Sequence, residues 1–156
     1  MRLLRNKTIS QITISELAKE AKVTRVTFYR NYQDLEDILQ IRINHLISDW
    51  YLKNKLEFER DKKDNNRNDL LLSSLFGHLI EFSDFYDVLY QQNLLHLIIP
   101  SLKIILSPQP SEKNFSAYLE SFFLHGIYGW ILEWFHRGKQ ESADEMESWL
   151  RKRIIV

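Results

Sequence analysis

The stretch ITISELAKEAKVTRVTFYRNY (12–32) decides how this chain is organised. Thr13 and Glu16 have the spacing of a capping box, in which a hydroxyl and a carboxylate satisfy free amides at a helix start. An apolar stripe follows, the sequence indicates a break at Lys22, and a second short helix opens at Thr24. The pattern is therefore that of two short helices joined by a tight turn.

Outward from this stretch the chain continues as helices. Asp34 is the expected cap of a long amphipathic helix, which gives way to the polar stretch DKKDNNRND (61–69), expected as a loop. Further helices are expected at 70–82, at 84–98 ending before Pro100, at 115–137 with Gly138 as the stop, and after a cap at Ser142. With only four Gly and three Pro in 156 residues, the expected fold is all-α.

Composition limits the class of protein. A chain with 44% hydrophobic residues can build one sizeable core, or one core and a small satellite. Cysteine is absent, which excludes disulfides, thiol nucleophiles and cysteine-based metal sites. No apolar run approaches the ~20 residues that span a bilayer. We therefore expect a soluble, cytoplasmic protein without a membrane partner.

Charge is distributed unevenly although the net charge is zero. Residues 1–35 hold seven basic and three acidic residues, a balance of +4. The other residues hold 14 basic and 18 acidic residues, a balance of −4. A basic end on an acidic body is expected where that end meets a polyanion such as DNA.

The two short helices match the helix-turn-helix that reads DNA. The first helix must pack on the second through small apolar residues, and the second must be slim enough to enter a groove ~12 Å wide. Thr24, Arg25 and Thr27 lie near the start of the second helix, where base edges are usually met. Its inward positions are expected at Val26 or Thr27, and at Phe28 and Tyr32.

These residues resemble the tetracycline-repressor (TetR/AcrR) family of transcription regulators. The likeness covers roughly residues 9–40, with an ELAKEA helix, a Val-Thr turn and a Thr-Phe-Tyr-Arg-x-Tyr helix (27–32). It implies a DNA-binding domain over 1–42 and a helical regulatory and dimerisation domain over 43–156. It also implies that Arg25 and Val26 face bases and that Thr27 contacts a base or phosphate.

The resemblance implies phosphate contacts from Thr13, Tyr29 and Asn31. The full set of expected DNA contacts is Thr13, Lys22, Thr24, Arg25, Val26, Thr27, Tyr29, Asn31 and Tyr32. The chain departs from the family at three points. Lys22 stands where the family usually has glycine, which costs of order 1 kcal/mol in a left-handed turn. Leu35 stands where a lysine often binds phosphate, and only Met1 to about Asn6 correspond to the family's first helix, which we expect to be truncated.

The segment 115–137 is apolar on more than one face, so we expect it to be buried on more than one side. One face is expected to pack in its own domain and the other against a second copy. The alternative is a central helix of a monomeric bundle. The expected dimer interface comprises Phe122, Gly126, Gly129, Trp130, Trp134 and Trp149, and 122–146 also resembles the last helices of one TetR branch. Two heads ~34 Å apart would read a palindromic operator in double-stranded DNA.

The middle helices carry aromatic residues that suit an effector pocket or an ordinary core equally well. The candidates for a small-molecule site are His78, Phe82, Tyr86 and Tyr90. The five histidines lack metal-ligand spacing and no Gly-rich phosphate loop occurs. We therefore expect no metal, no cofactor and no enzymatic activity.

The leading hypothesis is a homodimeric, ligand-responsive DNA-binding regulator, most often a repressor in this family. In it, an effector shifts the helix 34–60 and changes the spacing of the two heads. The alternative is a TetR-like co-regulator that acts through a protein partner, with weak or no direct DNA binding. A third hypothesis is a small-molecule binding protein with a vestigial head.

Overall fold

The computed structural model describes residues 1–63, 69–106 and 113–153. Every regular element in these ranges is a helix and none is a strand, so the all-α expectation is confirmed. The short 3₁₀ helices are η1 (Leu3–Arg5), η2 (Ile9–Gln11) and η3 (Leu95–Leu97). The α-helices are α1 (Ile14–Glu20), α2 (Arg25–Asn31), α3 (Leu35–Lys63), α4 (Asp69–Glu81), α5 (Ser83–Gln91), α6 (Ile98–Leu106), α7 (Asn114–His136) and α8 (Ala143–Arg153).

The helix starts follow the side-chain caps that the sequence predicts. The Thr13 hydroxyl accepts from the Glu16 amide at 3.2 Å, and Asp34 Oδ1 accepts from the Asp37 amide at 2.8 Å. Ser142 and Glu145 cap each other before α8, with the Glu145 amide donating to the Ser142 hydroxyl at 3.2 Å. These bonds satisfy amides that have no partner within the first helical turn.

Three predicted boundaries are wrong. The segment 84–98 is not one helix, because α5 ends at Gln91 and Asn93 takes a positive φ of 59° that turns the chain into η3. Pro100 does not stop a helix but lies in the first turn of α6, where its missing amide hydrogen is not needed. The loop predicted over 61–69 is too long at both ends, because α3 continues to Lys63 and α4 begins at Asp69. Residues 64–68 lie outside the described residues.

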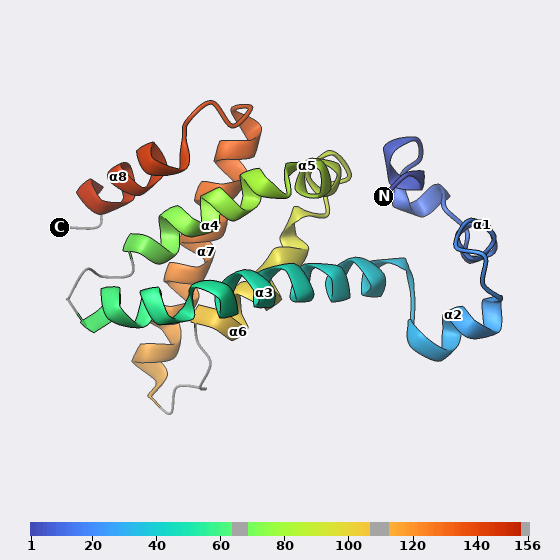
Figure 1. Ribbon diagram of the computed structural model, residues 1–156, viewed down its shortest axis with the longest axis horizontal. Helices are drawn as coiled ribbons and strands as arrows, with labels where there is room; N and C mark the ends of the chain where they lie inside the picture. The colour runs from blue at the N-terminus through green and yellow to red at the C-terminus, as the bar shows by residue number, and fades with distance from the viewer. Residues whose placement is uncertain (64–68, 107–112, 154–156) are drawn as a thin grey trace.

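The helix α3 connects two regions, which we name the head (residues 1–42) and the body (residues 43–153). At about 1.5 Å per residue its 29 residues span roughly 43 Å. Figure 1 shows α1 and α2 at one end of α3, while α4, α7 and α8 lie toward the other. The helix runs without a break past residues 42 and 43, so the expected domain boundary falls inside one rigid element.

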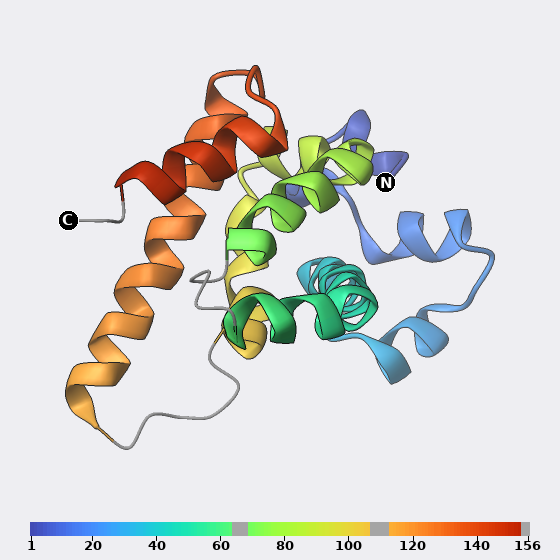
Figure 2. The same cartoon turned by 60° about the vertical axis from the view of Figure 1, so that its left-hand side comes forward.

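The body has the larger core. In it α4 packs against α8, α3 packs against α4 and α6, and α6 packs against α7. The fully buried side chains include Ile43, Tyr86, Ile131 and Trp134. Figure 2 shows that the first half of α7 extends away from the other helices of the body.

Buried and half-buried polar groups join α3 to its neighbours. The Ser101 hydroxyl on α6 donates to Asn44 Oδ1 at 2.6 Å, and Gln40 Nε2 donates to the Ser101 oxygen at 3.2 Å. The indole of Trp50 donates to the Ser74 hydroxyl on α4 at 2.8 Å. Because such groups are costly to bury unpaired, these bonds fix the position of α3 between α4 and α6.

Candidate functional site

The second short helix, α2, turns one aromatic ring inward and leaves the rest of its surface in solvent. Phe28 is 4% exposed, and Ala18 on the neighbouring helix α1 is 3% exposed. The helices α1 and α2 pack against each other, and the small Ala18 side chain allows them to approach closely. Val26 is 74% exposed and Tyr29 is 54% exposed. The expectation that Val26 or Thr27 points inward is therefore wrong, because both side chains lie in solvent.

Hydroxyl groups organise the start of α2. The Thr24 hydroxyl accepts from the Thr27 amide at 3.1 Å and lies 2.9 Å from the Thr27 hydroxyl. Asn31 Nδ2 donates to the Thr27 carbonyl at 2.8 Å. These exposed groups are thus held by local bonds, which leaves hydroxyl lone pairs and the Asn31 amide oxygen available to another molecule.

The turn before α2 has a left-handed residue. Lys22 has a φ of 56°, and the Val23 amide donates to the Ala18 carbonyl at 2.9 Å, which closes the end of α1. The expectation of a left-handed, non-glycine residue at this position is confirmed. The Lys22 side chain is exposed, so its charge lies at the surface beside α2.

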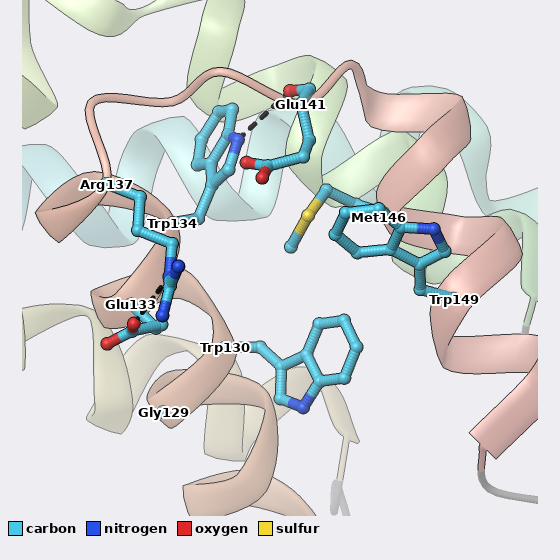
Figure 3. A pocket seen from close by; sticks show the side chains of 8 residues that line it. All are labelled: Gly129, Trp130, Glu133, Trp134, Arg137, Glu141, Met146 and Trp149. Carbon is cyan, nitrogen blue, oxygen red and sulfur yellow. Dashed lines mark hydrogen bonds and ion pairs between the residues drawn. The ribbon is translucent and has the colours of Figure 1, made fainter.

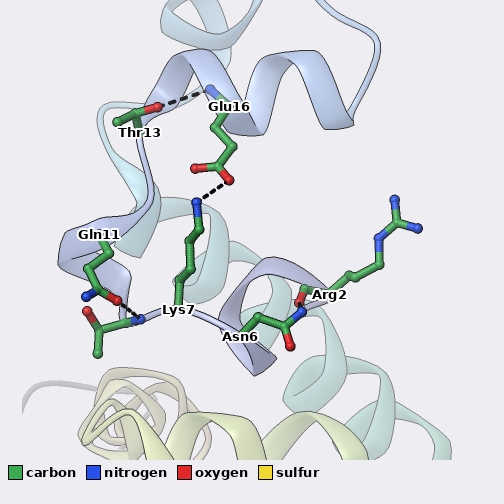
Figure 4. A network of polar contacts seen from close by, with 7 residues as sticks. Arg2, Asn6, Lys7, Gln11, Thr13 and Glu16 are labelled. Carbon is green, nitrogen blue, oxygen red and sulfur yellow. Dashed lines mark hydrogen bonds and ion pairs between the residues drawn. The ribbon is translucent and has the colours of Figure 1, made fainter.

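The acidic residues of α1 are neutralised by the segment that precedes it. Lys7 Nζ lies 2.6 Å from a Glu16 carboxylate oxygen, and Arg2 forms an ion pair with Glu20 (Figure 4 shows Lys7, Glu16 and Arg2). Arg5 lies 3.7 Å from Asp84 of the body. Three of the seven basic residues in this end of the chain are therefore engaged within the molecule.

The other four basic residues of this end lie on α1, the turn and α2. All four are exposed, and none forms an ion pair with another described residue: they are Lys19, Lys22, Arg25 and Arg30. With Glu16 and Glu20 paired, this surface has an uncompensated positive charge. Such a surface attracts polyanions through the sum of its charges.

The residues expected to contact DNA all lie on the head, in α1, α2 and the segments next to them. The exposed ones are Thr13, Lys22, Thr24, Arg25, Val26, Thr27, Tyr29 and Asn31. Tyr32 is half-buried, with its ring 5.6 Å from that of Phe28. Lys19 and Arg30 lie on the same surface but were not predicted from the sequence, because only the folded structure shows that Arg2, Arg5 and Lys7 are paired while these two are not.

A second notable surface is an apolar stripe on α7. Phe115 is 73% exposed and Phe122 is 72% exposed, and Tyr118 and Leu119 lie on the same side at helical spacing. The buried side chains of α7, among them Ile131, lie on the opposite side. Large exposed apolar patches on proteins often serve as interaction surfaces, which makes this stripe a candidate for one.

Two glycines continue this stripe toward the end of α7. A Cβ atom added to Gly126 or Gly129 meets nothing within 4 Å, so the helix backbone is accessible there. Of the expected interface residues, Phe122 and Trp149 are exposed and Trp130 is half-buried. Trp134 is 2% exposed and buried in its own chain, so its expected place in a dimer interface is wrong.

The side chains expected to form an effector pocket contact one another or their neighbours. His78 Nε2 shares a 2.9 Å hydrogen bond with the Tyr86 hydroxyl, and the Phe82 ring lies 5.0 Å from the His78 ring. The Tyr90 hydroxyl lies 3.2 Å from Nδ1 of His136. None of the four expected residues lines the two pockets described below, and His78 and Tyr86 are buried in the core of the body, so the effector site stays a prediction.

Burial changes the titration of the His78–Tyr86 pair. It lowers the pKa of His78 to about 4 and raises the pKa of Tyr86 well above its ordinary value, since both charged forms lose solvation. The pair is therefore neutral at physiological pH. A neutral hydrogen-bonded pair inside the core fits a packing role better than ligand binding.

The two pockets lie elsewhere. One, of about 220 Å³, lies between α7 and α8 (Figure 3). The other, also of about 220 Å³, is lined mainly by apolar residues of the N-terminal segment and the start of α3, including Leu4, Ile12 and Leu35.

Within the described ranges no cluster of three or more His, Asp or Glu side chains is arranged to hold a metal ion. No described helix combines the length and the apolar character needed to cross a membrane.

Comparisons with known proteins add nothing to this geometry. No protein-family model, curated protein or solved structure matches the chain.

Proposed function

We propose that this chain is a homodimeric DNA-binding transcription regulator, acting as a ligand-responsive repressor in the cytoplasm. The observation that carries the proposal is the surface of α1, the turn and α2. It combines four unpaired cationic groups with exposed hydroxyl, amide and aromatic side chains on a slim helix. Lysine and arginine would bind phosphates, while Arg25, Val26 and Thr27 would face base edges.

The apolar stripe on α7 supports the homodimer. Exposed rings at Phe115 and Phe122 need a partner to leave water, and open backbone at Gly126 and Gly129 suits a bulky ring from a second copy. A two-fold pair would place two α2 helices for successive major grooves of one palindromic site. Pairing also strengthens half-sites that bind weakly alone.

DNA binding is tested by selection from a random duplex library, followed by fluorescence anisotropy on the selected site at several salt concentrations. We expect a palindromic consensus and an affinity that falls steeply with salt. In a plot of log affinity against log salt concentration, each contacted phosphate should make the slope steeper by about 0.9. A flat salt dependence, or a library without enrichment, contradicts the proposal.

Matched lysine variants make the test specific to the head. Lys22→Ala removes an exposed, unpaired charge beside α2, and Lys53→Ala removes one from the body half of α3. We expect Lys22→Ala to reduce the salt slope by about 1 and Lys53→Ala to leave it unchanged. Arg25→Ala should instead remove the preference for one base at one position of each half-site, a loss of about 1 to 3 kcal/mol in discrimination against the other bases. Equal effects of the two lysine variants would show that the head is not the binding surface.

The dimer is tested by sedimentation of the full chain. Phe122→Asp places a charge in the apolar stripe, and Leu52→Asp places one on an exposed apolar position of α3. We expect the first variant to sediment as a monomer with lowered DNA affinity, and the second to remain a dimer. A wild-type monomer at micromolar concentration contradicts this part of the proposal.

A second function, that of a co-regulator, rests on the same α7 stripe, because an apolar surface does not specify an identical partner. In that case the chain would bind a different protein through α7 and reach DNA only in the complex. A wild-type chain that is monomeric and binds no DNA alone, but binds DNA when a purified partner is added, would favour this function. The Phe122→Asp variant should then abolish the complex.

A further inference from the structure

The pocket between α7 and α8 combines aromatic and acidic side chains. Trp130 and Trp134 of α7 line one side, Met146 and Trp149 of α8 line the other, and Glu141 lies in the connection between the helices. Figure 3 shows the Glu141 side chain extending from that connection toward the pocket, with the indole rings of Trp130 and Trp149 across from it. The proposed DNA contact uses none of these residues, and the proposed dimer surface shares only Gly129 with the pocket lining.

The chain reversal after α7 holds Glu141 in this position. Gly138 and Lys139 have positive φ values of 77° and 55°, so the backbone folds back over the end of α7. The buried Trp134 indole donates to the Glu141 carbonyl at 3.0 Å, which fixes the backbone of Glu141. The glutamate side chain therefore extends from a backbone position that the fold fixes beside the pocket.

Charges around the pocket leave one carboxylate without a counter-ion. Arg137 is the one cationic side chain among the described residues of the lining, and its Nε lies 2.6 Å from a Glu133 carboxylate oxygen. Lys139 is drawn away to an ion pair with Asp87 and lies over the Phe135 ring, 5.2 Å from its centroid. Glu141 is half-buried and forms no ion pair with a described residue, so the lining carries a net charge of −1 from Glu133, Glu141 and Arg137.

We infer that this pocket binds a small organic cation, of the quaternary or tertiary ammonium class. The π faces of tryptophan attract a cation, and a partly desolvated carboxylate adds direct charge compensation. The polarizable Met146 thioether suits the methyl groups of such a ligand. At about 220 Å³ the pocket is smaller than the ~300 to 1,000 Å³ that drug-sized ligands occupy, which favours a ligand of choline size.

The test uses the full chain and choline chloride, with the neutral carbon analogue of choline as the matched ligand control. Binding is followed by titration calorimetry, and the site is located by the NMR signals of the tryptophan indole groups. We expect saturable choline binding with shifts of the Trp130 and Trp149 signals. The carbon analogue has the same shape without the charge, so we expect it to bind at least about tenfold more weakly.

Two protein variants separate the carboxylate and the aromatic contributions. Glu141→Gln keeps the backbone bond to Trp134 and should weaken choline about tenfold, while leaving the carbon analogue unchanged. Asp144→Asn removes the same charge from an exposed position of α8 outside the lining and should leave choline binding unchanged. Trp149→Leu keeps apolar volume without a π face and should weaken choline by about fivefold.

Three outcomes would overturn the inference. They are equal binding of choline and its carbon analogue, equal weakening by Glu141→Gln and Asp144→Asn, and absence of choline binding to the full chain. The readout is direct binding without DNA. The ligand site and the DNA-binding function can therefore fail independently.

Discussion

The head and α7 expose different chemistry for different physical reasons. On α2, the surface around one buried ring carries exposed hydroxyl groups and cationic groups that form no ion pair with another described residue. On α7, the surface opposite a well-packed core carries exposed aromatic rings and accessible backbone. Unpaired charge in water costs little and recruits a polyanion, whereas exposed rings gain free energy only when an apolar partner covers them. This contrast is the basis for proposing DNA as the partner of the head and a second protein surface as the partner of α7.

The two regions also differ in how their cores are connected. Leu4, Ile12 and Leu39 of the head belong to the same apolar cluster as the core of the body. Ala18 and Phe28 are buried but lie outside that cluster. The contact between α1 and α2 is therefore a small separate core, and such units open more readily than the main one.

The largest expected effect tests the body. Trp134→Ala removes a side chain that is 2% exposed, contacts Phe76 edge-to-face at 5.3 Å, and holds the chain reversal through its indole. We expect a loss of about 3 to 5 kcal/mol in the free energy of unfolding, measured by urea denaturation. Leu52→Ala, at an exposed position of α3, should change it by less than about 0.5 kcal/mol. Similar losses for both variants would show that the core assignment is wrong.

The next effect tests the separate core of the head. Phe28→Ala removes its central ring, which should cost about 3 kcal/mol or more and open α1 and α2 while the body remains folded. Hydrogen exchange should show loss of protection confined to residues 14–31, with the urea midpoint of the body nearly unchanged. Tyr29→Ala, at the exposed neighbouring ring, should leave protection intact. Cooperative loss of the whole fold in Phe28→Ala would show that head and body form one unit.

A smaller effect concerns pH and the body alone. His78 is buried with a pKa lowered to about 4, while the unfolded chain takes up a proton near its ordinary value of 6.5. Between these values the unfolded state binds more protons, so stability is full above pH 6.5 and falls as pH is lowered toward 4. We expect this residue to contribute a loss of about 2 kcal/mol over that interval.

The variant His78→Gln provides the control for this pH dependence. Glutamine keeps a polar partner for the Tyr86 hydroxyl but does not titrate. Urea denaturation should therefore show a smaller loss of stability between pH 6.5 and 4 than in the wild type. Parallel pH profiles of the two proteins would rule out His78 as the source.

Local signals explain how much of this organisation the sequence predicts. Caps at Thr13, Asp34 and Ser142 and the left-handed turn at Lys22 depend on neighbouring residues, and each is present. The error at 84–98 arose because apolar periodicity continues through the turn at Asn93, which a non-glycine residue forms. A proline in the first turn of a helix gives the same local signal as one that ends a helix, hence the error at Pro100.

The sites were less predictable because they depend on distant contacts. Whether a lysine is free or paired follows from partners such as Glu16 for Lys7, which sequence spacing does not reveal. His78 and Tyr86 suited a pocket by residue type, yet their mutual bond makes them core. Glu141 was not predicted as a site residue, because only the chain reversal after α7 and its bond to the Trp134 indole bring it beside the tryptophans.

The smallest expected effect is at Lys22, where conformation and charge act in opposite directions. Its φ of 56° costs about 1 to 2 kcal/mol for a residue with a Cβ atom, and glycine removes this cost. Glycine also gives the unfolded chain more conformational entropy, which lowers stability by about 0.5 to 1 kcal/mol. Lys22→Gly should therefore stabilise the head by about 0.5 kcal/mol, seen as slower hydrogen exchange in α1 and α2. Lys22→Ala keeps the left-handed strain, so it should not stabilise. Both variants lose the charge and should weaken DNA binding equally. If Lys22→Gly binds DNA as tightly as the wild type while Lys22→Ala does not, the conformation of the turn rather than its charge determines how the head meets DNA.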